Sequence, residues 1–373
     1  MSSKRKQLKE IQIENEEIIE KVNKQIESLG KKTKVLYENL NDIQATFDRI
    51  RNIPSEQIIK YEELKKVRLN WKQQVEKIEK DYDGMVAKNA GAGAAGASAG
   101  VAVAAMGPTA AMGIATTFGV ASTGTAISSL SGAAATNAAL AWLGGGALAA
   151  GGGGMAAGNA FLALFGPVGW TIAGVAVLAS GIAMIKGIND QHKVQDVFIL
   201  IGERDKKRYR LSLVELKERN KRIKNESSLL EEAINEIISF GTDYKKMTEE
   251  QQYMLGSYVN LMNSSTQLLV NPILGLQPFY SEKDFGKYLR WSGKKAETLF
   301  CREYKDTIIA FSNLLFSIPL DEKDKKLLWK TFKSNKKMLE ALNLNKKDFT
   351  YSVMEAVYEA TSKASNEKYI KYL

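Results

Sequence analysis

The feature that most constrains this chain is a long segment without charge. No Asp, Glu, Lys, Arg or His occurs between Lys88 and Lys186, although charged residues make up 25% of the whole sequence. At about 20 residues per crossing, a run of this length can cross a bilayer three or four times. We therefore expect residues 89–185 either to meet lipid or to form an unusually apolar core.

Within this segment, one stretch is typical of a membrane helix. Most of the segment is Ala, Gly, Ser and Thr, which partition weakly into lipid, whereas residues 161–185 are rich in larger apolar side chains. Pro167 suits the first turn of a helix, Trp170 suits the membrane interface, and Lys186 ends the span. The predicted insertion residues are Trp142, Phe161, Leu164, Phe165, Pro167, Trp170, Ile172, Val175, Val177, Leu178, Ile182 and Ile185.

Small residues recur at spacings that allow helices to approach closely in lipid. They predict helix–helix contacts at Gly96, Gly100, Gly154, Gly158, Gly174 and Gly181. Two interpretations of the segment stay open. It is either a permanent multi-span anchor or a bundle of small residues that is packed against the rods until a trigger exposes it.

The chain is basic, with 52 Lys and Arg against 42 Asp and Glu. Four lysines flank the uncharged segment, namely Lys80, Lys88, Lys186 and Lys193. Each is expected to contribute about 1 kcal/mol of attraction to an anionic leaflet. The predicted partner is therefore a lipid bilayer, preferably anionic. Nucleic acid is not predicted, because the tryptophans are scattered and no recognition module occurs.

Charged helical rods flank the segment. Apolar positions recur every three or four residues from Leu8 to Ile50, resume from Tyr61 to Tyr82 after the break at Pro54, and return from Val194 to Ile237. A narrow apolar stripe with charged flanks predicts a coiled-coil helix that needs a helical partner. We expect the rods at 55–83 and 188–240 to pair antiparallel, with residues 84–187 as the head of the hairpin.

The expected fold class is all-α. The predicted regions are an N-terminal coiled coil (1–83), the membrane-insertion region (84–187), a return coiled-coil helix (188–240) and a helical C-terminal region (241–373) that packs back onto the rods. The runs VFILI at 197–201 and TIIAF at 307–311 resemble strands most closely, and we predict both as helix.

Catalytic chemistry is not indicated, and we predict a protein that is not an enzyme and has no cofactor or metal site. A single Cys301 and a single His192 cannot build a Cys/His metal cluster. Cys301 is expected to be a buried structural thiol. A literal G-x-G-x-x-G at Gly91, Gly93 and Gly96 follows a charged helix rather than a strand, so it does not predict dinucleotide binding.

This layout of long helices around an apolar segment resembles the α-helical pore-forming toxins of the cytolysin A and haemolysin BL type. The stretches AALAWLGGGALAAGGGGMAAG (138–158) and GPVGW (166–170) also resemble the glycine-zipper membrane segments of bacterial toxin-like effectors. The resemblance implies that residues 89–185 insert into a bilayer and that the rods assemble into a homo-oligomer.

The expected function is thus membrane permeabilisation by a toxin or cell-killing effector. The alternatives are a non-lytic, membrane-anchored scaffold that binds protein partners through its coiled coils, and a soluble coiled-coil adaptor. The first residues contain no apolar run of the length that a secretory signal needs. We therefore expect synthesis in the cytoplasm, membrane association when active, and any export by a signal-less route.

Overall fold

The computed structural model describes residues 3–89, 191–276, 279–280, 282–292, 300–334, 339 and 345–370. Within these ranges the chain is helical and contains no strand, which confirms the all-α prediction. Both strand-like runs, 197–201 and 307–311, lie in helices. The helices are α1 (Ser3–Phe47), α2 (Ser55–Asn89), α8 (Gln191–Ser239), α9 (Glu249–Val270), α10 (Glu282–Ser292), α12 (Lys305–Leu314), α13 (Glu322–Ser334) and α15 (Tyr351–Ile370), with short 3₁₀ helices η1 (Tyr244–Lys246) and η2 (Leu274–Leu276).

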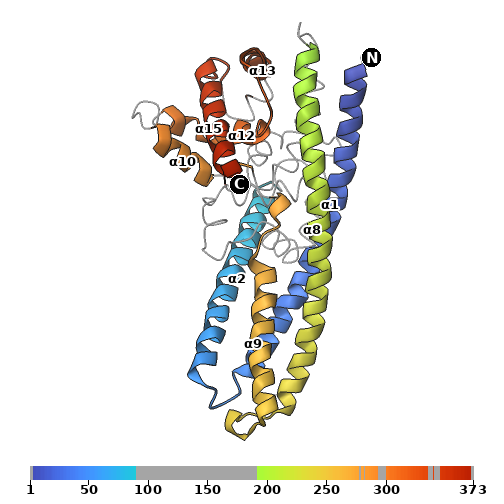
Figure 1. Ribbon diagram of the computed structural model, residues 1–373, viewed down its shortest axis with the longest axis vertical. Helices are drawn as coiled ribbons and strands as arrows, with labels where there is room; N and C mark the ends of the chain where they lie inside the picture. Colours follow the sequence, from blue (N-terminus) through green and yellow to red (C-terminus); the bar gives the residue numbers. More distant parts are fainter. Residues whose placement is uncertain are drawn as a thin grey trace.

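The four longest elements form two helical hairpins that stand side by side. α1 turns back into α2, and α8 turns back into α9, with both turns at the same end of the molecule (Figure 1). Pro54 directly precedes α2, where its missing amide costs no helical hydrogen bond. Gly241 follows the end of α8 with a φ of 82°, a left-handed conformation that glycine adopts without strain.

The two turns are fastened to each other. The Arg51 amide donates to the Thr242 carbonyl at 2.9 Å, and the Tyr244 amide donates to the Arg51 carbonyl at 3.0 Å. The Asn52 side chain also donates to the Asp243 carboxylate at 2.9 Å. This contact therefore joins segments that lie on either side of the uncharged region.

The arrangement of the rods corrects one prediction. α8 packs along α1, not mainly along α2, and the two helices run parallel: Lys4 pairs with Asp196 near their starts, and Asn39 bonds Ser227 further along. α2 runs opposite to α8, as predicted, but its main helical neighbour is α9 (Figure 1). The spacing of apolar residues determines which face of a helix is buried. It does not determine which other helix packs against that face.

The helices bury two apolar cores. The first fills the bundle of α1, α2, α8 and α9. The second joins the first turns of α1 and α8 to α10, α12, α13 and α15, and includes Leu8, Phe198 and Phe311. The expectation that the C-terminal region packs onto the rods is thus confirmed for its described residues. One apolar residue of this region, Leu274, is 74% exposed and does not take part in this packing.

Candidate functional site

Most residues of the predicted membrane site lie outside the described part of the chain. This holds for all insertion residues, Trp142, Phe161, Leu164, Phe165, Pro167, Trp170, Ile172, Val175, Val177, Leu178, Ile182 and Ile185, for the contact glycines Gly96, Gly100, Gly154, Gly158, Gly174 and Gly181, and for Lys186. What the structure describes is the scaffold to which this segment is attached, at Asn89 and Gln191.

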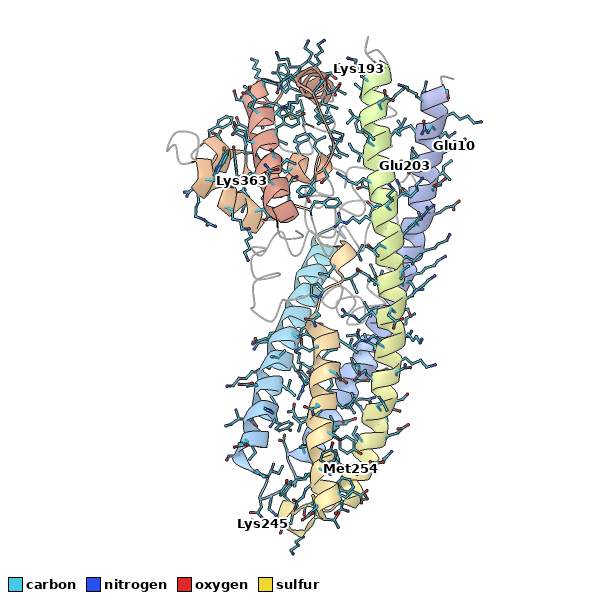
Figure 2. The ribbon with its side chains drawn as sticks, viewed as in Figure 1. Glu10, Lys193, Glu203, Lys245, Met254 and Lys363 are labelled. Carbon is cyan, nitrogen blue, oxygen red and sulfur yellow. The ribbon has the colours of Figure 1, made fainter. Side chains whose placement is uncertain are left out.

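The two attachment points lie at different levels of the rod. α2 ends part-way along α8, near η2, whereas α8 begins at the end of the molecule that holds the N-terminus (Figure 1). Lys80 and Lys88 belong to the last turns of α2, and their side chains are outside the described set. Lys193 is exposed in the first turn of α8 (Figure 2). The described flanking lysines therefore lie at two different levels of the scaffold.

Lys193 has an acidic neighbour, Asp321, which directly precedes α13. The backbone amide of Asp324, donating at 2.7 Å, and the positive charge of Lys193 both lower the pKa of Asp321. Lys193 thus stands at the surface beside a carboxylate that is ionised at neutral pH. Its environment is mixed in charge rather than purely basic.

The α1–α8 interface is a seam of buried side chains along nearly the whole of both helices. Every position of the predicted α1 pattern from Leu8 to Ile50 is buried, and Leu29, Leu36 and Leu40 are fully enclosed. On α8 the matching face includes Leu216, Ile223 and Leu230. The seam connects one flank of the uncharged segment to the other.

Buried asparagines set the register of this seam. Asn15 donates to the Gly202 carbonyl at 3.1 Å, Asn39 donates to the Ser227 carbonyl at 3.1 Å, and Asn220 donates to the Gln25 carbonyl at 3.0 Å. The Oδ1 atoms of Asn15 and Asn220 are buried and accept no hydrogen bond from the described residues. A buried asparagine costs stability and in return disfavours other registers, because sliding the helices would also break its donor bond.

α2 meets the bundle through a different kind of contact. Arg68 is only 2% exposed, yet no carboxylate pairs with it directly among the described residues. It donates to the Gln44 side chain and, at 3.3 Å, to the Thr266 hydroxyl, while its Nε has no partner there. Burial lowers the pKa of this guanidinium, which reports an incompletely compensated loss of solvation.

Aromatic side chains complete the α2 contact. The Tyr61 hydroxyl lies 2.8 Å from both the Gln44 carbonyl and the Asp48 carboxylate, and these two acceptors share its one hydrogen. Burial and the Asp48 hydrogen bond raise the pKa of Tyr61 well above its usual value. Trp71 packs on Tyr37 with ring centroids 5.4 Å apart, and its indole NH has no described partner. Aromatic side chains therefore form much of the contact between α2 and α1.

Three arginines of α8 bind the ends of neighbouring helices, a role that the sequence pattern did not predict. Arg219 donates to the carbonyls of Leu268 and Asn271 at 2.8 Å, at the end of α9. Arg204 donates to the Phe316 carbonyl at 2.7 Å, just past α12, and Arg208 donates to the Gly275 carbonyl at 2.6 Å. Cations are favourable at helix C-termini, where carbonyls lack helical partners.

A signal for these contacts is present in the sequence. Arg204, Arg208 and Arg219 are spaced by four and eleven residues, which places them on one side of a helix. They lie within a predicted rod that carries many other charged residues, so spacing alone does not distinguish them. Together they make α8 the helix on which the bundle and the C-terminal region are both assembled.

The described residues contain few of the side chains that ligate metals or act as nucleophiles in close groups. No group of three or more His, Cys, Asp and Glu side chains that could hold a metal ion occurs among them. Cys301 is 2% exposed, as predicted, and its thiol lies 3.8 Å from the Tyr288 hydroxyl, which donates to Glu359 at 3.1 Å. His192 lies in α8, but its side chain is outside the described set.

Among the described helices, none combines the length and the apolar character needed to span a bilayer. Comparison with known proteins adds no assignment: no family model, no curated protein and no solved structure matches this chain.

Proposed function

We propose that this protein is a non-enzymatic, membrane-permeabilising effector that inserts residues 89–185 into a lipid bilayer and oligomerises there through its rods. The observation that carries the proposal is the absence of charge from Asn89 to Ile185 in a chain that is otherwise highly charged. Each charged residue at the centre of a membrane helix costs about 3 kcal/mol, so a segment free of charge is suited to lipid.

The scaffold is compatible with this role. The seam between α1 and α8 and the fastened turns at Arg51 and Asp243 join the two flanks of the uncharged segment directly. The flanks are therefore bound to each other as well as to the segment between them. On this proposal, the uncharged segment passes from water into lipid while the α1–α8 seam stays intact.

The resemblance to helical pore-forming toxins supports the same proposal, because those proteins also carry an apolar segment on long helices. On this proposal the protein is made in the cytoplasm and becomes membrane-associated when it acts. The alternative is a membrane-anchored scaffold that does not lyse. It shares the inserted segment and differs in leaving the bilayer sealed.

Dye release from liposomes tests the proposal. Full-length protein is added to anionic and to neutral vesicles, and its binding and the release of dye are measured together. Val177→Asp places a charge inside the best predicted span and should abolish release. Ile58→Asp is the matched control, because Ile58 is 42% exposed on α2, and it should release dye as the unmodified protein does.

Binding without release would favour the anchored scaffold. Absence of both, at every pH and lipid composition, would overturn the proposal. Equal release by the Val177→Asp and unmodified proteins would place the activity outside the uncharged segment.

A further inference from the structure

The outer face of α8, opposite the seam, carries a row of exposed aliphatic side chains. Leu200, Leu211, Val214 and Leu229 are 44%, 57%, 63% and 48% exposed. Their separations of 11, 3 and 15 residues are close to whole numbers of helical turns, so all four lie on one side of the helix. Single exposed leucines are ordinary, whereas an aligned row over about 44 Å of helix marks an interaction surface.

Among the described residues, the elements that pack on α8 leave this face exposed. α1 takes up one side of α8 through contacts such as Lys206 with Glu14. α9, η2 and the end of α12 take up another side through Arg219, Arg208 and Arg204. The aliphatic row lies between these two sides, on the part of α8 that points away from the bundle.

Charges along the face are complementary to the same face in reverse. Its N-terminal half carries the exposed Lys193 and Lys207, and its C-terminal half carries the exposed Glu218 and Glu232. A second copy of α8 can be packed antiparallel about the point midway between Ser212 and Leu213. Three pairs of residues then lie opposite each other: Lys193 with Glu232, Lys207 with Glu218, and Leu211 with Val214.

The opposite orientation lacks this match. In a parallel pair Lys207 would face Lys207, and Glu218 would face Glu218, so like charges would meet at equal heights. In the antiparallel pair Arg222 falls opposite Glu203, and Lys221 falls opposite Arg204, whose charge is already paired with Asp205 at 2.7 Å. The arrangement is self-complementary, as a two-fold interface requires.

We propose that two copies of this protein associate in water through the outer faces of α8, packed antiparallel about the midpoint between Ser212 and Leu213. Such an interface is closed and yields a dimer. It goes beyond membrane permeabilisation, because it concerns the protein before it meets lipid.

The geometry determines where the two uncharged segments would be attached. With a rise of 1.5 Å per residue, the two Gln191 ends would lie about 65 Å apart at opposite ends of the pair. The two uncharged segments would therefore join α8 ends that point in opposite directions.

Charge reversal tests the interface without lipid. The mass in solution is measured by light scattering over a range of concentrations for the full-length protein, Lys207→Glu, Glu218→Lys and the double variant. Each single reversal places two pairs of like charges in contact and should weaken the dimer by about tenfold. The double variant restores opposite charges and should dimerise as the unmodified protein does.

The control is Lys60→Glu, an exposed position on α2 that should leave the dimer unchanged. Far-ultraviolet circular dichroism verifies that every variant is folded. A protein that stays monomeric at all concentrations, or a dimer that ignores both reversals, would overturn the proposal. Neither result depends on dye release, so failure here is distinct from failure of the proposed function.

Orientation is tested by cross-linking. Lys193→Cys and Glu232→Cys are prepared separately, in a chain whose native Cys301 is buried. A mixture of the two should form a disulfide-linked dimer on mild oxidation, and each variant alone should not. Efficient cross-linking of Lys193→Cys with itself would show a parallel pair and would overturn the antiparallel assignment.

Discussion

The α1–α8 pair and the α2–α9 pair belong to one bundle, but they bury polar groups differently. Along α1 and α8, buried asparagines donate to backbone carbonyls of the facing helix, and the buried carboxylate of Asp205 is paired with Arg204 at 2.7 Å. Along α2 the buried polar group is Arg68, which is charged and only partly compensated. The first arrangement fixes orientation at modest cost, whereas the second leaves a desolvation penalty in place.

This difference indicates which helix is held less firmly. α2 is the helix that leads directly into the uncharged segment, and its interface carries the penalty. Under the proposed function, a weakly held α2 would ease release of the uncharged segment while the α1–α8 seam stays firm. The following substitutions test the contacts of the bundle one at a time, in order from the largest expected effect on stability to the smallest.

Leu36→Ala should have the largest effect, because Leu36 is fully enclosed in the seam. Removing three buried carbons leaves a cavity and should lower the free energy of unfolding by about 3 kcal/mol. Chemical denaturation measures the loss. The neighbouring Val35→Ala is the control, since Val35 is 43% exposed and its loss should stay within about 0.5 kcal/mol. Similar losses at both positions would contradict a dominant seam.

Arg68→Met should raise the free energy of unfolding by about 1 to 3 kcal/mol. An unbranched apolar side chain fills much of the same volume without the cost of desolvating a charge. Thr266 keeps a partner, because its hydroxyl donates to the Met262 carbonyl at 2.6 Å. The measurement is chemical denaturation of both proteins. A loss of stability instead would show that the bonds to Gln44 and Thr266 outweigh the desolvation of Arg68.

Gly275→Ala tests the contact that joins the end of α9 to α8. A Cβ atom at this position would lie 2.5 Å from the Ser212 hydroxyl and 3.3 Å from the Ser212 Cα. Crowding of this kind should cost about 1 to 3 kcal/mol, measured as a fall in the midpoint of denaturation. Gly286→Ala in α10 is the matched control, because its nearest neighbour is 3.8 Å away, and it should be neutral or stabilising by helix propensity.

Substitution of Asp243 should have the smallest effect on stability, and this effect depends on pH. The side chain of Asn52 lowers the pKa of Asp243, as do the Lys245 amide and nearby cations. A depressed folded pKa adds stability above the unfolded pKa of about 3.9, and this contribution disappears as pH falls through the folded value. Asp243→Asn should therefore melt at a slightly lower temperature than the unmodified protein at neutral pH. The two melting curves should converge in acid, and a constant difference at all pH values would contradict a role for the charge.

The buried faces of the rods could be predicted from the sequence. The positions from Leu8 to Ile50 and from Tyr61 to Val75 are buried as their three-and-four spacing indicates. This succeeds because amphipathic periodicity is a local property of a helix. The break at Pro54, the all-α class and the buried Cys301 follow from equally local rules.

Only the tertiary structure decided which helices meet and in which direction. Each rod presents a similar apolar stripe, so spacing does not distinguish α1 from α2 as the partner of α8. The choice depends on contacts between residues far apart in the chain, such as Asn220 with Gln25 and Arg51 with Thr242. For the same reason, the spacing of α2 does not reveal the cost of burying Arg68. The loss of solvation depends on what surrounds a charge and not on its place in a repeat.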